Sequence, residues 1–114
     1  MVKVYIAGPY RASSTWGVHC NIHNAKQWGL EIAQLGANPF IPHANTGYYD
    51  GTLPEQFWLD ADIEWLVLCD ALFVLPGSDH SAGTQEEIRI AEQAGIPVFH
   101  TLVGLDAFIQ EEYP

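Results

Sequence analysis

Positively charged residues are scarce in this sequence. Its 114 residues include 4 Lys and Arg against 14 Asp and Glu, which gives a formal net charge of −10 at pH 7. Binding to a nucleic-acid backbone or to an anionic membrane needs clustered positive charge, so we expect neither partner. A mononucleotide is not excluded, because it needs only one local positive site.

Cysteines and long apolar runs are scarce as well. Cys20 and Cys69 stand alone, without metal-ligand spacing, so we expect reduced thiols in a cytoplasmic protein. The sequence shows neither a signal peptide nor an apolar run long enough for a transmembrane helix. Repeats and low-complexity linkers are also absent, and we expect residues 1–114 to form a single domain with its own core.

Short apolar segments alternate with helical patterns along the chain. Four segments are expected to be strands: Val2–Ala7, Pro39–Pro42, Ala71–Leu75 and Ile96–Thr101. Four others are expected to be helices: Asn21–Leu35, Pro54–Cys69, Gly83–Ala94 and Gly104–Gln110. This alternation predicts an α/β three-layer sandwich, flavodoxin- or Rossmann-like, with a parallel sheet of four or five strands. The first and third of the expected strands should lie at its centre.

The stretch Cys69–Ala91 combines a buried strand, a loop of turn-forming residues and the start of a helix. In open α/β sheets, ligands bind beyond the carboxyl ends of strands, beside helix amino ends. Glu87 shares a helical face with apolar residues such as Ile90, whereas Glu86 shares one with Arg89 and is expected in solvent. A carboxylate on an apolar face is either a structural buried acid or a functional group.

The helix expected at Pro54–Cys69 is apolar almost all round. Such a helix is buried on more than one side, which in a small domain indicates a second subunit. We therefore expect a homodimer or a larger homo-oligomer. Asp62 lies on the apolar stripe, about 200° around the helix from Asp60. It is either a second functional acid or an Asp at a frayed helix surface.

Two loops complete the candidate site. Gly8–Ser14 follows the first strand and carries Arg11, which is either a phosphate clamp or a surface charge. His43–Leu53 is rich in aromatics and either lies over the site or simply connects two elements. The five histidines have no convincing zinc pattern, so we expect no metal and no other cofactor.

Taken together, three segments resemble the nucleoside 2-deoxyribosyltransferase family, which includes the deoxynucleoside 5′-monophosphate N-glycosidases. They are VYIAGPYRASS, then DIEWL, then SAGTQEE followed by IRIA, and the resemblance extends from Val4 to about Phe99. Asp62 within DIEWL is one anchor. The most specific part is the spacing of four residues in the last segment: Ser81, Gly83, Glu87 and Ala91.

The resemblance implies cleavage or transfer of the N-glycosidic bond of a (deoxy)nucleoside or nucleoside 5′-monophosphate, with retention of configuration. Glu87 would be the nucleophile, Asp62 would bind the sugar or transfer a proton, and Tyr5 would lie near the nucleophile. The candidate substrate-binding residues are Gly8, Arg11, Ser13, His43, Ser81 and Gly83. Among these, the loop from Gly8 to Ser13 and Ser81 would hold the 5′ end of the substrate, including any phosphate.

Other functions stay open. The chain is shorter than typical transferases of that family, in which a C-terminal segment of a neighbouring subunit completes the site, so transfer and hydrolysis are both possible. Leu75–Gly77 with Gly83, Thr84 and Glu87 resemble the PGG-x-GT-x-x-E signature of cytokinin-type nucleoside monophosphate phosphoribohydrolases, although the glycines are further apart. A non-catalytic nucleotide-binding or sensing module would keep the same loops without turnover.

Overall fold

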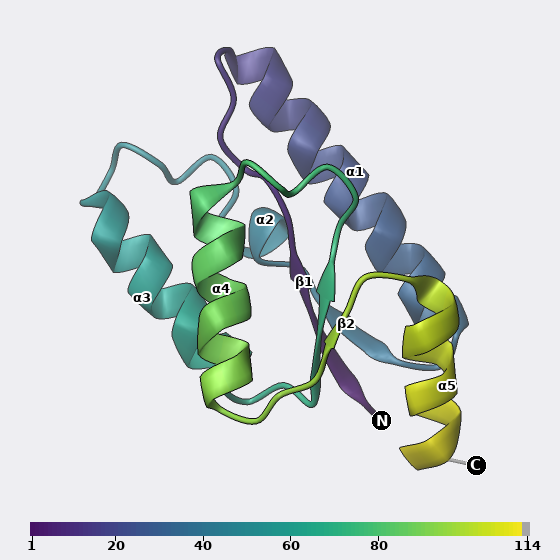
Figure 1. Ribbon diagram of the computed structural model, residues 1–114. Helices are drawn as coiled ribbons and strands as arrows, with labels where there is room; N and C mark the ends of the chain where they lie inside the picture. Colours follow the sequence, from purple (N-terminus) through teal and green to yellow (C-terminus); the bar gives the residue numbers. More distant parts are fainter. Residues whose placement is uncertain (113–114) are drawn as a thin grey trace.

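Four parallel strands form one sheet in the computed structural model, which describes residues 1–112 (Figure 1). The strands are β1 (Lys3–Ala7), β2 (Asn38–Phe40), β3 (Ala71–Val74) and β4 (Val98–Phe99). Their order in the sheet is β2-β1-β3-β4, so β1 and β3 are central. The predicted α/β sandwich with a parallel sheet is confirmed.

The two central strands are aligned so that their ends coincide. Val4 of β1 pairs with Ala71 of β3, and Ala7 pairs with Val74. Because both strands run in the same direction, the loops that follow them leave the sheet at the same edge. This alignment brings the loop that begins at Gly8 next to the loop that begins at Leu75.

Helices cover both faces of the sheet (Figure 1). The structure describes α1 (Thr15–Gln34), α2 (Pro42–Asn45), α3 (Glu55–Leu66), α4 (Ala82–Gln93) and α5 (Leu102–Glu112). Side chains of α1 and α5 pack with Val4 and Ile6 of β1, and side chains of α3 and α4 pack with Tyr5 and Ala7. This division follows from the alternation of side chains along a strand. No helix in the described part of the chain has the length and apolar character needed to cross a lipid bilayer.

The first helix is longer than its sequence pattern predicted. α1 begins at Thr15 rather than at Asn21, because the side chain of Ser14 accepts a hydrogen bond from the backbone N–H of Gly17 at 3.1 Å. A serine in this position replaces a missing intrahelical partner and fixes the start of a helix. The end of the helix agrees with the prediction, since Gly36 follows it in the left-handed conformation with φ +96°.

Other predicted boundaries are wrong as well. The helix predicted at Pro54–Cys69 is shorter and covers Glu55–Leu66, and the strand predicted at Pro39–Pro42 covers Asn38–Phe40. The segment predicted as a loop from His43 begins with the single turn of α2, which Pro42 starts because its φ angle is already helical. β4 contains only Val98–Phe99 of the strand predicted at Ile96–Thr101. Helix α5 covers Leu102–Glu112, so it begins two residues before and ends two residues after the helix predicted at Gly104–Gln110. Tyr113–Pro114, considered as a segment that completes a neighbouring site, lies outside the described residues.

Most apolar side chains of α3 are less buried in the single chain than the composition of this helix predicted. Within one chain, only Leu66 of this helix is fully buried. Five large apolar side chains on α3 and immediately after it are between 37% and 65% exposed: Phe57, Leu59, Trp65, Val67 and Leu68. The single chain therefore leaves an apolar surface on this side, which we call the α3 face.

We expect Leu72→Ala to lower the free energy of unfolding by about 2–5 kcal/mol, because Leu72 is fully buried at the centre of the sheet and its truncation leaves a cavity. Leu30→Ala is the matched control, since Leu30 is 61% exposed on α1 and its loss should change the free energy by less than about 0.5 kcal/mol. Urea unfolding of both variants measures the difference. Equal effects would show that β3 is not at the core.

Candidate active site

An open cleft lies where the two central loops leave the carboxyl edge of the sheet. Its volume is about 1090 Å³, and sites for small molecules commonly occupy about 300–1,000 Å³. Its walls come from the loop after β1, from α2 and the loop that follows it, from α3 and from the start of α4. It is lined by seven of the residues singled out in the sequence: Gly8, Arg11, His43, Asp62, Ser81, Gly83 and Glu87.

Two other candidates lie elsewhere. Tyr5 is not part of the cleft lining, because it lies under the cleft and is fully buried in the sheet. Ser13 is exposed in the loop before α1 and does not line the cleft. The structure therefore does not bring Ser13 together with the other candidate residues.

Glu87 is held from below by Tyr5. The hydroxyl of Tyr5 donates a hydrogen bond to Oε2 of Glu87, joining β1 to α4. Burial raises the pKa of Glu87 to about 8; the Tyr5 hydrogen bond opposes this rise, and the negative charge of Asp62 adds to it. Burial and the charge of Glu87 also raise the pKa of Tyr5 well above its ordinary value, so the phenol remains a donor.

Asp62 is the second acid of the cleft. It lies on α3, which packs against α4 and so faces the helix that carries Glu87. Burial raises the pKa of Asp62 to about 6. Its Oδ1 atom is buried and has no hydrogen-bond partner among the described residues. The two acids therefore have separated pKa values, the arrangement that lets one carboxyl hold a proton while the other is ionised.

His43 ties α2 to the loop after β1. Its Nε2 lies 3.0 Å from the carbonyl oxygen of Gly8 and 3.1 Å from that of Pro9. Both partners are acceptors, which assigns the ring hydrogen to Nε2. Burial lowers the pKa of His43, although the two carbonyls oppose this change, so the imidazole is neutral and Nδ1 is an acceptor.

Unpartnered polar atoms in the described residues gather in the cleft. Three buried side-chain atoms within residues 1–112 have no hydrogen-bond partner: Nδ1 of His43, Nε1 of Trp58 and Oδ1 of Asp62. All three residues line the cleft. Buried polar groups are nearly always paired in folded proteins, so such a group of exceptions marks a place for a polar ligand or for ordered water.

The loops at the base of the cleft are packed tightly together. A Cβ atom at Gly8 would lie 2.5 Å from Cδ1 of Leu75, so only glycine lets the two central loops approach this closely. Ser81 caps α4 by accepting hydrogen bonds from the backbone N–H of Thr84 at 3.3 Å and from its hydroxyl at 2.9 Å. Gly83 follows in the first turn of the helix.

Arg11 is already engaged. Its guanidinium group lies 2.7 Å from Oε1 of Glu55 at the start of α3, and both side chains are more than half exposed. The positive charge expected to hold a phosphate therefore has a carboxylate partner within the chain.

Sequence reasoning missed several residues of the cleft. Trp58 lies four residues before Asp62 on α3, so helical spacing alone places both on the same face. The hydroxyl of Tyr10 donates to Asp50 at 2.7 Å and accepts from the backbone N–H of Tyr48 at 2.8 Å, which ties down the aromatic loop. Nothing in the sequence alone indicated that Tyr10 would bridge these two segments.

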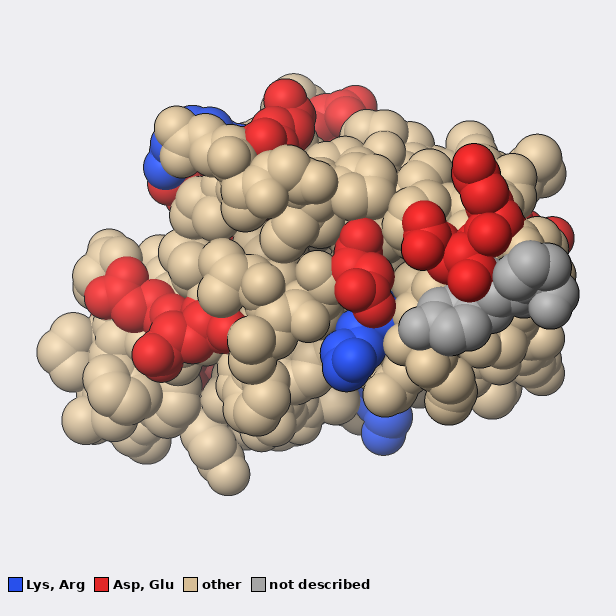
Figure 2. Space-filling model, turned by 90° about the horizontal axis from the view of Figure 1, so that it is seen from below, with Lys and Arg blue, Asp and Glu red and all other residues tan. Residues whose placement is uncertain are grey.

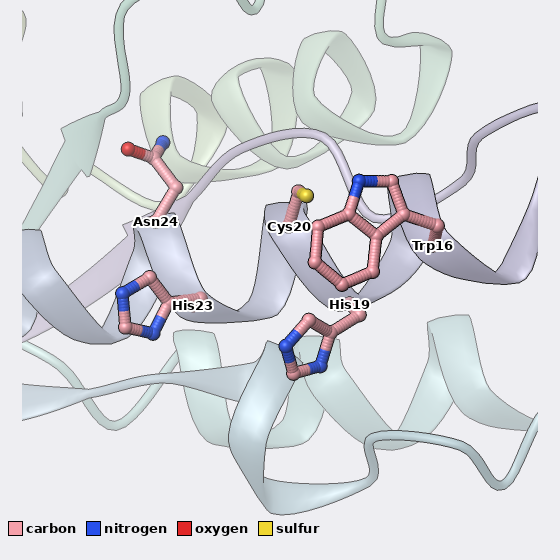
Figure 3. A pocket seen from close by; sticks show the side chains of 5 residues that line it. All are labelled: Trp16, His19, Cys20, His23 and Asn24. Carbon is pink, nitrogen blue, oxygen red and sulfur yellow. The ribbon is translucent and has the colours of Figure 1, made fainter.

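A smaller hollow of about 290 Å³ lies on α1 and has no acidic side chain in its lining. Trp16 stacks on His19 there, with ring centroids 5.3 Å apart (Figure 3). Its five residues all come from the one helix: Trp16, His19, Cys20, His23 and Asn24. Across residues 1–112, no three His, Cys, Asp or Glu side chains are grouped as metal ligands would be.

Comparisons with known proteins agree with this architecture. A family model described as "Domain of unknown function (DUF7768)" matches residues 2–101. No curated protein matches the sequence.

Solved structures with a similar fold include two bacterial proteins. One is a 2-deoxyribosyltransferase from Bacillus psychrosaccharolyticus, with 23% identity and a TM-score of 0.62 over 85% of this chain and 69% of that one. The other is a conserved protein from Enterococcus faecalis V583, with 30% identity and a TM-score of 0.63 over 86% of this chain and 61% of that one. Both likenesses concern the fold, and the chain spans less than two thirds of the second protein.

The raised pKa of Glu87 predicts how Glu87→Gln changes thermal stability with pH. A carboxyl whose pKa rises from 4.5 to about 8 on folding contributes stability that is present below pH 4.5 and is lost as the pH rises to 8. Gln does not ionise, so the variant should gain in Tm over the wild type between pH 5.5 and 8, by more than about 5 °C at pH 8. Thermal unfolding followed by circular dichroism at several pH values measures this gain.

Glu92→Gln is the matched control, because Glu92 is exposed on the same helix and does not line the cleft. It should show no gain that grows with pH. A constant difference between the Glu87 variant and the wild type at every pH would contradict the burial of the carboxyl group.

Proposed function

We propose that this chain, which belongs to the family described as "Domain of unknown function (DUF7768)", cleaves or transfers the N-glycosidic bond of a (deoxy)nucleoside or nucleoside 5′-monophosphate. The observation that carries the proposal is the enclosed carboxyl of Glu87, held by Tyr5 and lying in the cleft with a second acid, Asp62. Similarity in fold to a 2-deoxyribosyltransferase supports the same reaction class.

The proposed reaction has two displacements at the anomeric carbon. The carboxylate of Glu87 forms a bond to C1′ while the bond from C1′ to the base breaks, and the base leaves with the bonding electrons and takes up a proton. Water or a second base then attacks C1′, gives up a proton to Asp62 or to solvent, and releases Glu87 as a carboxylate. Two inversions give net retention, as in retaining glycosidases.

The environment of Glu87 suits this reaction. With a pKa of about 8, much of Glu87 is protonated at pH 7 in the free protein, so its charged form is destabilised by the surroundings. The transition state places positive charge on the sugar ring, and this charge stabilises the ionised carboxylate. Asp62, with a pKa of about 6, is mostly ionised at pH 7, so it would accept a hydrogen bond from a sugar hydroxyl. To transfer a proton to the leaving base, it would first take up the proton that Glu87 gives up when Glu87 ionises to attack C1′.

Glu87→Gln should reduce base release by about a thousandfold or more, since it removes the nucleophile and keeps the size of the side chain. Chromatographic assay of free base from a panel of nucleosides and 5′-monophosphates measures this loss. Glu92→Gln on the outer face of α4 is the control and should keep wild-type activity.

A 2-deoxy-2-fluoro nucleoside that slows the second displacement should leave a covalent label on Glu87, detectable by mass spectrometry of peptides. A label on another residue would refute the assignment of the nucleophile. Undiminished base release by Glu87→Gln would refute the whole mechanism, and substrate binding without any base release by the wild type would favour a sensing module.

We further propose that two copies of the chain associate through the α3 face. In the single chain this surface exposes Phe57, Trp65 and Leu68 by 50%, 48% and 65%, which is costly for apolar side chains in water. Burial of such residues against a second copy would make the helix as enclosed as its composition predicts.

Light scattering at micromolar concentration should therefore give the mass of a dimer or a larger oligomer. The double variant Trp65→Glu/Leu68→Glu should shift it to a monomer, because charges oppose burial of this face. Val103→Glu is the control, since Val103 is 83% exposed on α5 and lies off the α3 face. A monomeric wild type would contradict this proposal.

A further inference from the structure

We propose that the cleft selects nucleosides with an uncharged 5′-hydroxyl over 5′-monophosphates, and that Glu55 enforces this choice by pairing with Arg11. The inference rests on the proposed function and names the substrate class of the same site. It follows from the charges and hydrogen-bonding groups that surround the cleft.

Acidic residues dominate the cleft lining. The described residues contribute only one Lys or Arg to it, Arg11. The same lining contains six acids: Asp50, Glu55, Asp60, Asp62, Glu86 and Glu87. A phosphate monoester carries a charge of about −1.5 to −2 at neutral pH, so it would bring more negative charge into a region that already has an excess.

Two of the other three cations lie away from the cleft, and the third offsets only one of its acids. Of the 4 Lys and Arg, Lys3 lies at the start of β1 and therefore at the opposite edge of the sheet, and Lys26 is exposed on α1. Arg89 forms an ion pair with Glu86. Seen from below, the opposite edge of the sheet also shows several groups of acidic side chains and few basic ones (Figure 2).

Glu55 is paired with the guanidinium group of Arg11, which is the group that would bind a phosphate. A guanidinium holds a phosphate through a planar pair of N–H donors, and in this structure Nη2 of Arg11 lies 2.7 Å from Oε1 of Glu55. The pair is exposed, so its own strength is small. A phosphate that displaced Glu55 from Arg11 would nevertheless lie close to the Glu55 carboxylate, and the two negative charges would repel each other.

The unpartnered buried atoms favour the same substrate. Oδ1 of Asp62 and Nδ1 of His43 are acceptors, and Nε1 of Trp58 is a single neutral donor. A dianionic phosphate offers acceptors only, so it has nothing to donate to an acceptor. A nucleoside has a 5′-hydroxyl hydrogen that can pair with an acceptor of this kind and that the 5′-monophosphate lacks, while the other hydroxyls and the base are common to both.

The amino end of α4 favours an anion, but weakly. A helix dipole is equivalent to about half a positive charge at its amino end. Glu86 and Glu87 lie within the next turns of the same helix, and Ser81 already accepts the backbone N–H of Thr84 there. The full charges of the cleft acids therefore outweigh the dipole.

The test compares the four 2′-deoxynucleosides with their 5′-monophosphates at pH 8, where histidine side chains are ordinarily uncharged. For the base that reacts best, kcat/KM for base release should be at least about tenfold higher for the nucleoside than for the monophosphate. The ratio should fall as salt rises from 0.01 to 0.5 M, because added ions screen the repulsion.

Glu55→Gln should raise kcat/KM for the monophosphate by about three- to tenfold. The ratio of kcat/KM for the nucleoside to that for the monophosphate should fall accordingly. Adding Arg11→Met to that variant should cancel the gain, because the released guanidinium is then lost. Glu31→Gln removes the same charge from the exposed side of α1, outside the cleft, and should leave the ratio unchanged.

The outcomes separate this inference from the proposed function. Base release that is as fast or faster from monophosphates overturns the inference and leaves the function standing. An equal gain for both substrates in Glu55→Gln overturns the role of Glu55. If neither substrate releases base, the proposed function fails. Titration calorimetry with the same pairs of nucleoside and monophosphate then tests the inference about substrate choice. Selective binding of the nucleoside then supports the inference, and tighter binding of the monophosphate or no binding of either overturns it.

Discussion

The enclosure of one carboxyl group, that of Glu87, is the constraint around which this cleft is arranged. An acid removed from water favours its neutral form, and its ionised form requires nearby hydrogen-bond donors. In this chain the donor is Tyr5, which comes from the central strand and is itself fully buried. The geometry of the helix that carries the acid is thereby linked to the middle of the sheet, so the core and the cleft share the same side chain.

The parallel sheet makes this link possible. Because β1 and β3 end together, the loops of both strands, the start of α4 and the acid on α3 surround one space. His43 adds a crosslink from α2 to the carbonyls of the first loop. Most of the cleft is therefore built from groups attached to regular elements, which hold side chains more firmly than free loops do.

Local periodicity carried much of what could be predicted from the sequence. The alternation of strand and helix patterns predicted the layered fold, and helix spacing predicted that Glu87 faces the interior while Glu86 lies in solvent with Arg89. Both results depend on residues a few positions apart. The start of α1 also depends on a local feature, the capping residue Ser14, but the sequence prediction did not recognise Ser14 as a cap.

Contacts between distant segments were not predictable in the same way. The pairing of Arg11 with Glu55 depends on how closely the first loop approaches the start of α3, and no spacing along the chain encodes that distance. The same holds for the bonds from His43 to the first loop. The exposure of α3 is a further case, because composition indicates that apolar side chains need cover without saying whether the same chain supplies it.

The close approach of Gly8 to Leu75 has a consequence for how this scaffold diversifies. Any side chain at position 8 would collide with Leu75, so the floor of the cleft tolerates little variation in shape. The rim is different, because residues 48–53 are exposed and are fastened through the hydroxyl of Tyr10. New ligand preferences are therefore most accessible by exchanging rim residues, and a mutagenesis library that spares the floor and randomises the rim would sample the variants that still fold.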